Sequence, residues 1–329
     1  MLPRRELIMV QPLTLSAPSR VHFGLIGMND QTARRFGGVG LGIDHFRTVI
    51  DIEANRTGDL DVEGGDAAAI TLAKHIATKL GATGMRITLR QMPPRHCGFG
   101  SGTTLALALT EGISLALGQR LAIPAIKRTS GRGGASGIGS AVYFAGGFVA
   151  DGGHQQAPTE AFLPSGAVSG DFTVPKCVWR MHWPEAWQLL IAYPPTFEVV
   201  SGKEEVDFFA ANLPVALETA AMAALALTFE LPSALRSLDF SAFRTGLNRS
   251  WQSGFKQAEV LAQLEVVNVL RTIAEVSSVC ATMSSMGPAL LIVGRDAAAI
   301  DAARSMLPSE WRVISGGADN FGRQVAFAD

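Results

Sequence analysis

The chain has 329 residues, of which 47% are hydrophobic and 17% are charged, with 28 Lys and Arg against 29 Asp and Glu. That length predicts two domains, each large enough to bury a core, and the high apolar content excludes an intrinsically disordered chain. The net charge of -1 provides no overall field that would attract nucleic acid or an acidic membrane, so any anionic ligand must be held by a local site.

The cysteines and the apolar runs indicate the compartment. Cys97, Cys177 and Cys280 are far apart and form no CxxC motif, which argues against a disulfide framework or a structural zinc and fits a reducing compartment. The N-terminus has no apolar run long enough for a signal peptide. The most apolar later stretch, Leu213–Phe229, contains Glu218 and is too short to span a bilayer. We therefore expect a cytoplasmic protein that binds neither nucleic acid nor a membrane.

The first half of the chain contains both strand and helix patterns. Apolar and polar residues alternate in VIDIEA, as in a half-buried strand. Ile70, Ala73 and Ala77 recur on one side of a helix, and Gly81 is placed to end it. The elements expected here are strands at Leu13–Ala17, Val49–Ala54 and Met85–Gln91 and helices at Asp66–Leu80 and Thr103–Leu117.

The periodicity is lost over Gln155–Lys176, where Pro, Ser and Gly are frequent, so we expect a domain boundary there. It divides the chain into residues 1–165 and 166–329. The second half predicts an α+β arrangement without a sequence repeat. Its expected elements are strands at Trp187–Tyr193, Pro288–Gly294 and Arg323–Phe327, helices at about Val206–Phe229, Asp239–Ser250 and Glu259–Glu275, and a short Ala-rich helix before the last strand.

A glycine-rich turn, PPRHCGFGSGTT, leads from a predicted strand directly into an apolar helix. Glycines in such a turn let the backbone approach a ligand, aim successive N–H groups at it and place the positive end of the helix beside it. The turn supplies Gly98, Gly100 and Gly102, with hydroxyl donors at Ser101 and Thr103. It is neither a Walker A loop nor a dinucleotide fingerprint. It predicts a phosphate site, although a tight turn before a buried helix would use the same glycines.

Three segments occur in an order that points to a fold family: PPRHCGFGSGTTLALAL, then ASGIGSAVYFAGG, then SSMGPAL. In this order they resemble the three motifs of the GHMP kinase superfamily, whose central loop usually reads P-x-x-x-G-L/I-G-S-S-A. The resemblance covers nearly the whole chain. It implies an α+β, GHMP kinase-like fold, with an N-terminal domain like domain 2 of ribosomal protein S5 and a ferredoxin-like C-terminal domain, and it implies that the third motif returns beside the phosphate loop.

One position departs from many of the kinases. In kinases of the mevalonate type the second motif resembles P-S-G-x-D-N, and its Asp accepts the hydroxyl proton during phosphoryl transfer. Ser136 and Gly137 match this motif, but Gly139 stands at the Asp position, and glycine has no proton acceptor. Homoserine kinase-like members also lack that Asp. A small-molecule kinase that uses ATP and Mg²⁺ is therefore kept as the alternative interpretation.

The remaining signatures point to one branch of the superfamily. APSRVHFGLIGMND, RRFGGVGLGID, GRGGASGIG, FAGGFVADGGH and SSMGP resemble the β-ribofuranosylaminobenzene 5'-phosphate synthase family. In that family phosphoribosyl pyrophosphate and 4-aminobenzoate or 4-hydroxybenzoate give a C-riboside 5'-phosphate, with loss of CO2 and pyrophosphate, in the synthesis of tetrahydromethanopterin-type one-carbon carriers. The resemblance implies Mg²⁺, no PLP, flavin or nicotinamide, and a homodimer.

This reaction requires positioning and electrostatics rather than a nucleophilic side chain. By analogy with the kinases, the loop Gly98–Thr103 is the pyrophosphate candidate. Arg20 and His22 are catalytic candidates that would hold the carboxylate or the sugar phosphate, since the fork of an Arg bonds either anion. In the glycine turn DGGH, Asp151 and His154 are candidates for a Mg²⁺ ligand and an acid or base, with Asp151 the metal candidate.

Each candidate has an ordinary alternative: a surface salt bridge for Arg20, a packed ring for His22 and a turn for Asp151. A non-catalytic ligand-binding protein is a third interpretation, against which the costly glycines of the loops argue. Whether the benzoate carries an amino or a hydroxy group stays open. The residues predicted to bind phosphate or substrate are His96, Gly98, Gly100, Ser101, Gly102, Thr103, Arg132, Gly133, Gly134, Ser136, Gly137, Ser284, Ser285 and Gly287.

Overall fold

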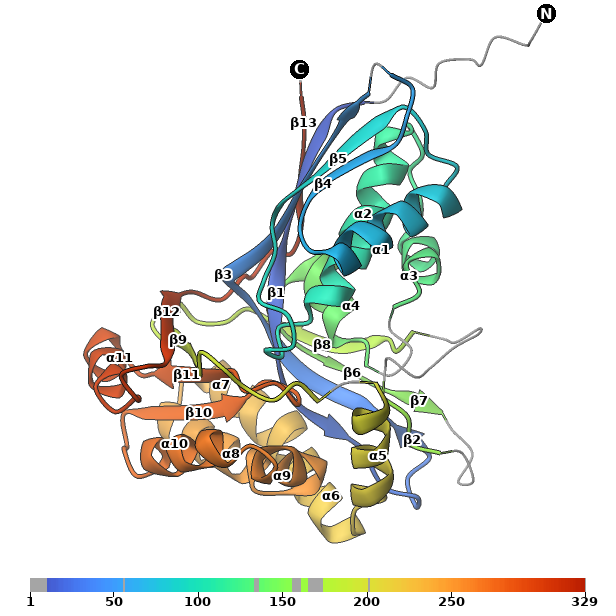
Figure 1. The fold of residues 1–329 in the computed structure, drawn as a ribbon. Coiled ribbons are helices and arrows are strands. Elements are labelled where there is room, and N and C mark those ends of the chain that lie inside the picture. The colour runs from blue at the N-terminus through green and yellow to red at the C-terminus, as the bar shows by residue number, and fades with distance from the viewer. Residues whose placement is uncertain are drawn as a thin grey trace, which may run out of the picture.

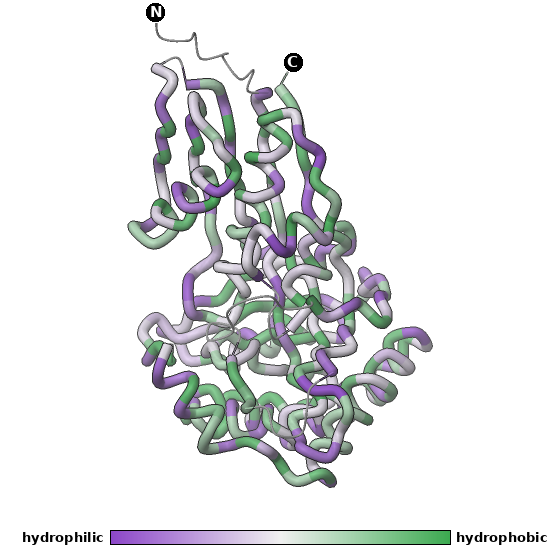
Figure 2. Tube along the Cα trace, turned by 90° about the vertical axis from the view of Figure 1, so that its right-hand side faces the viewer, coloured by the Kyte–Doolittle hydropathy of each residue, from purple (hydrophilic) through white to green (hydrophobic). Residues whose placement is uncertain are grey.

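The computed structural model describes residues 11–55, 57–132, 136–155, 161–164, 174–200 and 202–328. Two main sheets lie one above the other in Figure 1, and helices pack against each. Hydrophilic and hydrophobic residues intersperse along the outer helices in Figure 2, as expected of helices that bury one face and expose the other.

The first sheet has seven strands among the described residues, in the order β13-β1-β3-β5-β4, with β6 paired to β3 and β8 to β6. All of its pairs are antiparallel except β4 with β5. A separate ribbon pairs β2 (Arg34–Arg35) with β7 (His154–Gln155). The strands of the sheet are β1 (Leu13–Ile26), β3 (Gly37–Ala54), β4 (Asp61–Gly64), β5 (Met85–Gln91), β6 (Phe148–Asp151), β8 (Cys177–Met181) and β13 (Gln324–Phe327).

Strands β1 and β3 are much longer than the sequence predicted. The expected strands at Leu13–Ala17 and Val49–Ala54 form only one end of the pair, which continues past a register shift between Pro18 and Ser19. The continuation is buried on both faces, so it lacks the alternation on which the prediction relied. Figure 1 shows both strands running from the first layer down into the second.

Helix α1 (Ala67–Lys79), strand β5 and helix α2 (Ser101–Ala116) confirm three predicted elements. The Asp66 side chain caps α1 by accepting a hydrogen bond from the Ala69 N–H at 2.8 Å. Helix α2 is buried along most of its length, as its apolar sequence predicts, and follows Gly100 at φ 72°. Two further helices are α3 (Ile123–Ser130) and α4 (Ile138–Ala145).

The second sheet has four antiparallel strands in the order β10-β11-β9-β12. This order, with helices between β9 and β10 and between β11 and β12, is the ferredoxin-like arrangement. The strands are β9 (Gln188–Tyr193), β10 (Val279–Met283), β11 (Leu290–Gly294) and β12 (Arg312–Gly316). The helices are α5 (Lys203–Asn212), α6 (Leu217–Leu225), the π-helical η1 (Ala226–Glu230), α7 (Leu231–Ser237), α8 (Phe240–Trp251), α9 (Gly254–Leu261), α10 (Leu264–Ala274) and α11 (Ala297–Arg304).

Two predicted helices of this half are wrong in their bounds. The single helix expected at Val206–Phe229 is interrupted after α5, because Pro214 cannot continue a helix. The helix expected at Glu259–Glu275 is in fact two, since α9 begins earlier and ends before Ala262. Helix α8 matches its prediction closely.

Strands β8 and β13 belong to the first sheet although both follow residue 166. The last strand therefore returns to the first layer, and the division at residues 165 and 166 stays a prediction. Within the described residues no single helix is long and apolar enough to cross a membrane; α5 together with Leu217–Ser237 passes that test only as a pair bent by 108°.

Candidate functional site

The glycine-rich loop between β5 and α2 packs against the turn that follows β10, Ser284–Gly287, which we call the SSMG turn. The Ser284 hydroxyl donates a hydrogen bond to the Gly98 carbonyl at 2.7 Å. A Cβ on Gly98 would lie 2.1 Å from the Ser284 carbonyl oxygen, and one on Gly287 would lie 2.2 Å from the Cys97 carbonyl carbon. These distances are far below contact, so both glycines are required for the loop and the SSMG turn to lie backbone to backbone.

Arg20 lies beneath this loop, in the interior of β1 rather than at the end of the shorter strand that was predicted. Its guanidinium donates to the Gly98 carbonyl, and its backbone N–H donates to Phe99 at 3.2 Å. A Cβ on Gly100 would lie 3.0 Å from Arg20 Nε. Burial lowers the pKa of Arg20 to about 10, against the opposing effect of Glu259, so the guanidinium remains a cation at neutral pH.

His22 follows Arg20 on β1 and is buried. Its N–H donates to the Ser284 hydroxyl at 2.9 Å, its carbonyl accepts from the Ser285 N–H at 3.1 Å, and its ring Nε2 is 3.2 Å from Ser136 Oγ. Burial, and then two neighbouring cations, hold the pKa of His22 well below its usual range. The ring is therefore neutral at pH 7, so it exchanges hydrogen bonds but adds no positive charge.

Asp151 ends β6, and its carboxylate holds the second glycine-rich loop. Oδ2 accepts hydrogen bonds from Ser136 Oγ at 3.1 Å and from the Gly137 N–H at 2.9 Å, while Oδ1 accepts from the Gly153 N–H at 2.8 Å. Burial raises the pKa of Asp151 to about 6 despite these bonds. Its position therefore links the Ser136 hydroxyl, and through it the His22 ring, to strand β6.

The described residues do not fit a Mg²⁺ site built by the protein alone. They contain no group of three or more His, Cys, Asp and Glu side chains that could hold a metal ion. Both carboxylate oxygens of Asp151 already accept hydrogen bonds within the protein. The metal role of Asp151 stays a prediction.

A buried ion pair on α9 was missed by the sequence analysis. Lys256 Nζ lies 2.9 Å from Glu259 Oε2 and donates to the Ser285 carbonyl at 2.8 Å, and both charged side chains are less than 5% exposed. Burial lowers the pKa of Lys256, while Glu259 opposes that shift. The charge of Lys256 is close enough to lower the pKa of His22.

We call Arg20, His22, Lys256, Glu259 and Ser284 the deep cluster. Hydrogen bonds run through it from Glu259 to Lys256, to the SSMG turn, and on to β1 and the glycine-rich loop. Because two cations stand against one carboxylate within it, the deep cluster favours an anionic ligand beside the loop. The fixed donors of the loop and of α2 point to a phosphate or a carboxylate.

The start of helix α2 carries three further predicted residues, Ser101, Gly102 and Thr103. A Cβ on Gly139, at the position of the kinase Asp, would lie 3.0 Å from Thr103 Cγ2. Any side chain there would press on the first turn of α2. The glycine at this position therefore has a packing reason in this chain as well as removing a proton acceptor.

The other predicted residues lie around this centre in different ways. His96 is exposed and adopts φ 60°, a left-handed conformation that is uncommon for a residue with a side chain. His154 is in β7, opposite Arg35 in register. Gly133 and Gly134 lie outside the described residues.

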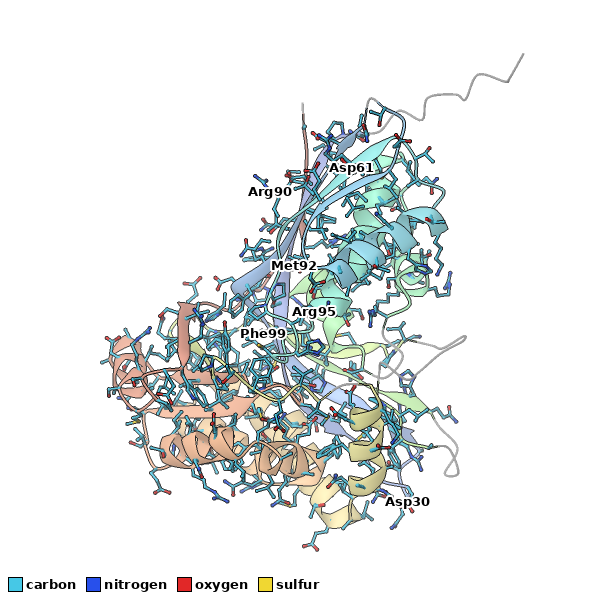
Figure 3. The ribbon with its side chains drawn as sticks, viewed as in Figure 1. Asp30, Asp61, Arg90, Met92, Arg95 and Phe99 are labelled. Carbon is cyan, nitrogen blue, oxygen red and sulfur yellow. The ribbon has the colours of Figure 1, made fainter. Side chains whose placement is uncertain are left out.

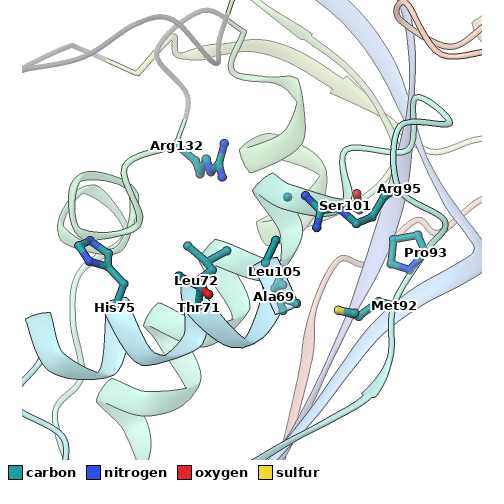
Figure 4. A pocket seen from close by; sticks show the side chains of 12 residues that line it. Ala69, Thr71, Leu72, His75, Met92, Pro93, Arg95, Ser101, Leu105 and Arg132 are labelled. Atoms are coloured by element: carbon teal, nitrogen blue, oxygen red, sulfur yellow. The ribbon is translucent and has the colours of Figure 1, made fainter. Parts of the chain in front are cut away.

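A cavity of about 410 Å³ opens beside the loop, between α1 and the start of α2. Its apolar wall includes Leu72, Met92 and Leu105, and two guanidinium groups, of Arg95 and Arg132, lie at its edge (Figure 4). Figure 3 places Met92 and Arg95 on the segment that leads from β5 toward α2. Sequence patterns gave no sign of this cavity, because its walls come from three separate elements.

Comparison with known proteins assigns the fold and the family. The family described as GHMP kinases N terminal domain matches residues 67–147. The β-ribofuranosylphenol 5'-phosphate synthase of Methanothermobacter thermautotrophicus is 32% identical over 87% of this chain and 89% of that protein. Its counterpart from Archaeoglobus fulgidus is 32% identical over 85% and 87%. The chain belongs to the β-ribofuranosylphenol 5'-phosphate synthase family.

Members of this synthase family are enzymes, and this one has the GHMP kinase fold. Homoserine kinase from Cytophaga hutchinsonii superposes with a TM-score of 0.68 at 17% identity, covering 97% of this chain and 98% of that one. Mevalonate diphosphate decarboxylase from Staphylococcus aureus superposes with a TM-score of 0.61 at 12% identity, covering 98% and 100%. These two structures establish the fold alone, whereas the synthase relatives establish the family.

Proposed function

We propose that the chain joins the ribosyl 5-phosphate of phosphoribosyl pyrophosphate to 4-hydroxybenzoate, with release of CO2 and pyrophosphate. The relatives are named for a ribofuranosylphenol product, and a phenol corresponds to the hydroxy acid rather than to the amino acid. The observation that supports the proposal is the glycine-rich loop, whose Gly98 carbonyl accepts hydrogen bonds from Arg20 and Ser284, together with Gly139 at the position of the kinase Asp.

The reaction balances without a nucleophilic side chain or a redox partner. The para oxygen donates electron density into the ring, and the ring carbon that bears the carboxylate bonds to the anomeric carbon of the sugar. The bond from that anomeric carbon to pyrophosphate breaks, and pyrophosphate leaves with its electron pair. The bond to the carboxylate then breaks, its electrons restore the aromatic ring, and CO2 is released.

In this proposal the enzyme acts by positioning and by electrostatics. Backbone N–H groups at Gly100, Ser101 and Gly102, with the positive end of α2, stabilise the charge that develops on the leaving pyrophosphate. Arg20 and Lys256 supply the positive charge beneath the loop, while the neutral ring of His22 positions Ser136. Mg²⁺ would be brought by the pyrophosphate of the substrate, because the described residues contain no cluster of side chains that could hold the ion.

The test is a decarboxylation assay without ATP. Purified protein receives phosphoribosyl pyrophosphate, Mg²⁺ and carboxyl-labelled 4-hydroxybenzoate, and labelled CO2 is followed together with the mass of the product. We expect release that requires both substrates and is faster than with 4-aminobenzoate. Folded protein that releases no CO2 but transfers phosphate from ATP to a small alcohol would instead be a kinase. Preference for 4-aminobenzoate would overturn the choice of acceptor alone.

A further inference from the structure

The cavity of about 410 Å³ beside the glycine-rich loop has no role in the reaction steps proposed above. One wall is apolar, formed by Leu72 of α1, Met92 after β5 and Leu105 of α2. Thr71 and His75 add polar groups on the α1 side, as Figure 4 shows. A pocket with mainly apolar walls and a few polar groups is typical of a site for a small organic molecule.

The charge at the edge of the cavity is positive. Arg95 is held by Asp66, whose two carboxylate oxygens lie 3.0 and 2.9 Å from Arg95 Nη1. Arg132 is half-buried and has no carboxylate partner among the described residues. Burial, and then the charge of Arg95, lower the pKa of Arg132. The guanidinium of Arg132 is therefore available to a ligand, and its planar fork matches a carboxylate.

The position of Arg132 connects the cavity to the phosphate loop. A Cβ on Gly102 would lie 3.7 Å from Arg132 Nη2, and both Ser101 and Gly102 line the cavity. A molecule in the cavity would thus lie next to the residues proposed to hold the leaving pyrophosphate. A reaction that forms a bond between two substrates requires such neighbouring sites.

We propose that this cavity binds the aromatic acid, with the ring against Leu72, Met92 and Leu105 and the carboxylate on Arg132. The inference rests on the proposed function, since it places the second substrate of that reaction. The acid has an apolar ring and one anionic group, and the cavity has an apolar wall and one guanidinium group without a carboxylate partner among the described residues. Hydrogen bonding by Thr71 or His75 would then serve the para substituent.

Two variants test the site. Arg132→Met removes the guanidinium, and Leu72→Trp places a larger side chain in the apolar part of the cavity. Loss of a hydrogen-bonded charge should weaken 4-hydroxybenzoate binding by roughly 10- to 100-fold, while the KM for phosphoribosyl pyrophosphate stays within about twofold. Arg128→Met is the matched control, because Arg128 is exposed on α3 and does not line the cavity. It should leave both values unchanged.

Calorimetry with 4-hydroxybenzoate alone separates this inference from the proposed function. Binding to the parent protein that is lost in Leu72→Trp supports the site whether or not CO2 is released. A parent protein that releases CO2, with benzoate binding unchanged in both variants, overturns the site and leaves the function intact. If Leu72→Trp abolishes ATP binding instead, the cavity is a nucleotide site. If the parent neither binds the acid nor releases CO2, both proposals fail.

Discussion

The deep cluster and the cavity border the same glycine-rich loop, one at Gly100 and the other at Gly102, but they are built in opposite ways. In the deep cluster the charged groups are bonded to neighbours, and Lys256 and Glu259 are buried, so their positions are fixed before any ligand arrives. In the cavity the walls are apolar, and Arg132 has no carboxylate partner among the described residues. A fixed cluster suits a leaving group whose charge changes during reaction, whereas an open pocket suits a molecule that must enter and leave.

The largest effect should come from breaking the buried pair of the deep cluster. Lys256→Met leaves Glu259 buried without its partner, which should reduce the free energy of unfolding by about 3–5 kcal/mol. The change also frees the Ser285 carbonyl, so kcat/KM should fall by roughly 10- to 100-fold, since small misplacements in a site have effects of that size. Urea unfolding and the CO2 assay measure the two quantities.

A double variant separates stability from function at this position. Lys256→Met with Glu259→Leu replaces both charges by apolar groups and should recover most of the lost stability. Activity should stay low, because the Ser285 carbonyl and His22 still lack the lysine. Recovery of full activity together with stability would show that Lys256 is only a structural residue.

The close contact between the glycine-rich loop and the SSMG turn can be tested at Gly98. Gly98→Ala places a methyl group against the Ser284 carbonyl, in a backbone conformation with φ +94°. We expect a loss of about 1–3 kcal/mol of stability and loss of binding of phosphoribosyl pyrophosphate. Gly118→Ala is the matched control, since Gly118 also has positive φ but nothing within 4 Å. Equal effects of the two substitutions would contradict the packing explanation.

The Asp151 carboxylate, which accepts a hydrogen bond from Ser136, should make the free energy of unfolding depend on pH. The pKa of Asp151 is about 6 in the folded protein against an ordinary 3.8, so between these values the folded state binds more protons than the unfolded state. The contribution of Asp151 to the free energy of unfolding therefore falls as pH rises from about 4 to about 6, by up to about 3 kcal/mol. Urea unfolding of the parent and of Asp151→Asn across this range gives the difference, which should be flat above pH 7.

The smallest effect is expected at the edge of the cavity. Arg95 and Asp66 are 45% and 47% exposed, so water screens their ion pair. Arg95→Ala should change the free energy of unfolding by less than about 1 kcal/mol. A thermal unfolding curve measures it. A loss as large as that of Lys256→Met would remove the contrast between the cavity and the deep cluster.

Sequence patterns predicted the fold well wherever one motif or one periodicity decided it. The glycine-rich turn before an apolar helix predicted α2, and alternation predicted the Val49–Ala54 end of β3. Local patterns failed where packing came from distant elements, as in the buried half of β1, which has no alternation. The break after α5 is different, because Pro214 signals it locally and the expectation of one continuous helix overlooked that proline. The family fold was predicted from three motifs rather than from any single element.

The site could be predicted only in part, for a physical reason. Arg20, His22 and Asp151 belong to motifs, so they were named, but their contacts with Gly98 and Ser136 depend on how β1, α4 and β6 pack. Lys256 has no motif around it. Its signal is a lysine three residues before a glutamate in an amphipathic helix, which usually indicates a solvated pair. Only the tertiary structure shows that this pair faces inward.

Strand β13 affects the order in which the chain can fold while it is being synthesised. It pairs with the outer edge of β1 from Leu13 to Ser16, more than 300 residues away along the chain. During synthesis on the ribosome, that edge has no partner until the second layer has already emerged, and unpaired strand edges invite pairing with other chains. Arg323, just before β13, forms an ion pair with Glu111 of α2 at 2.8 Å. The layer that is translated first is therefore the last one to be completed.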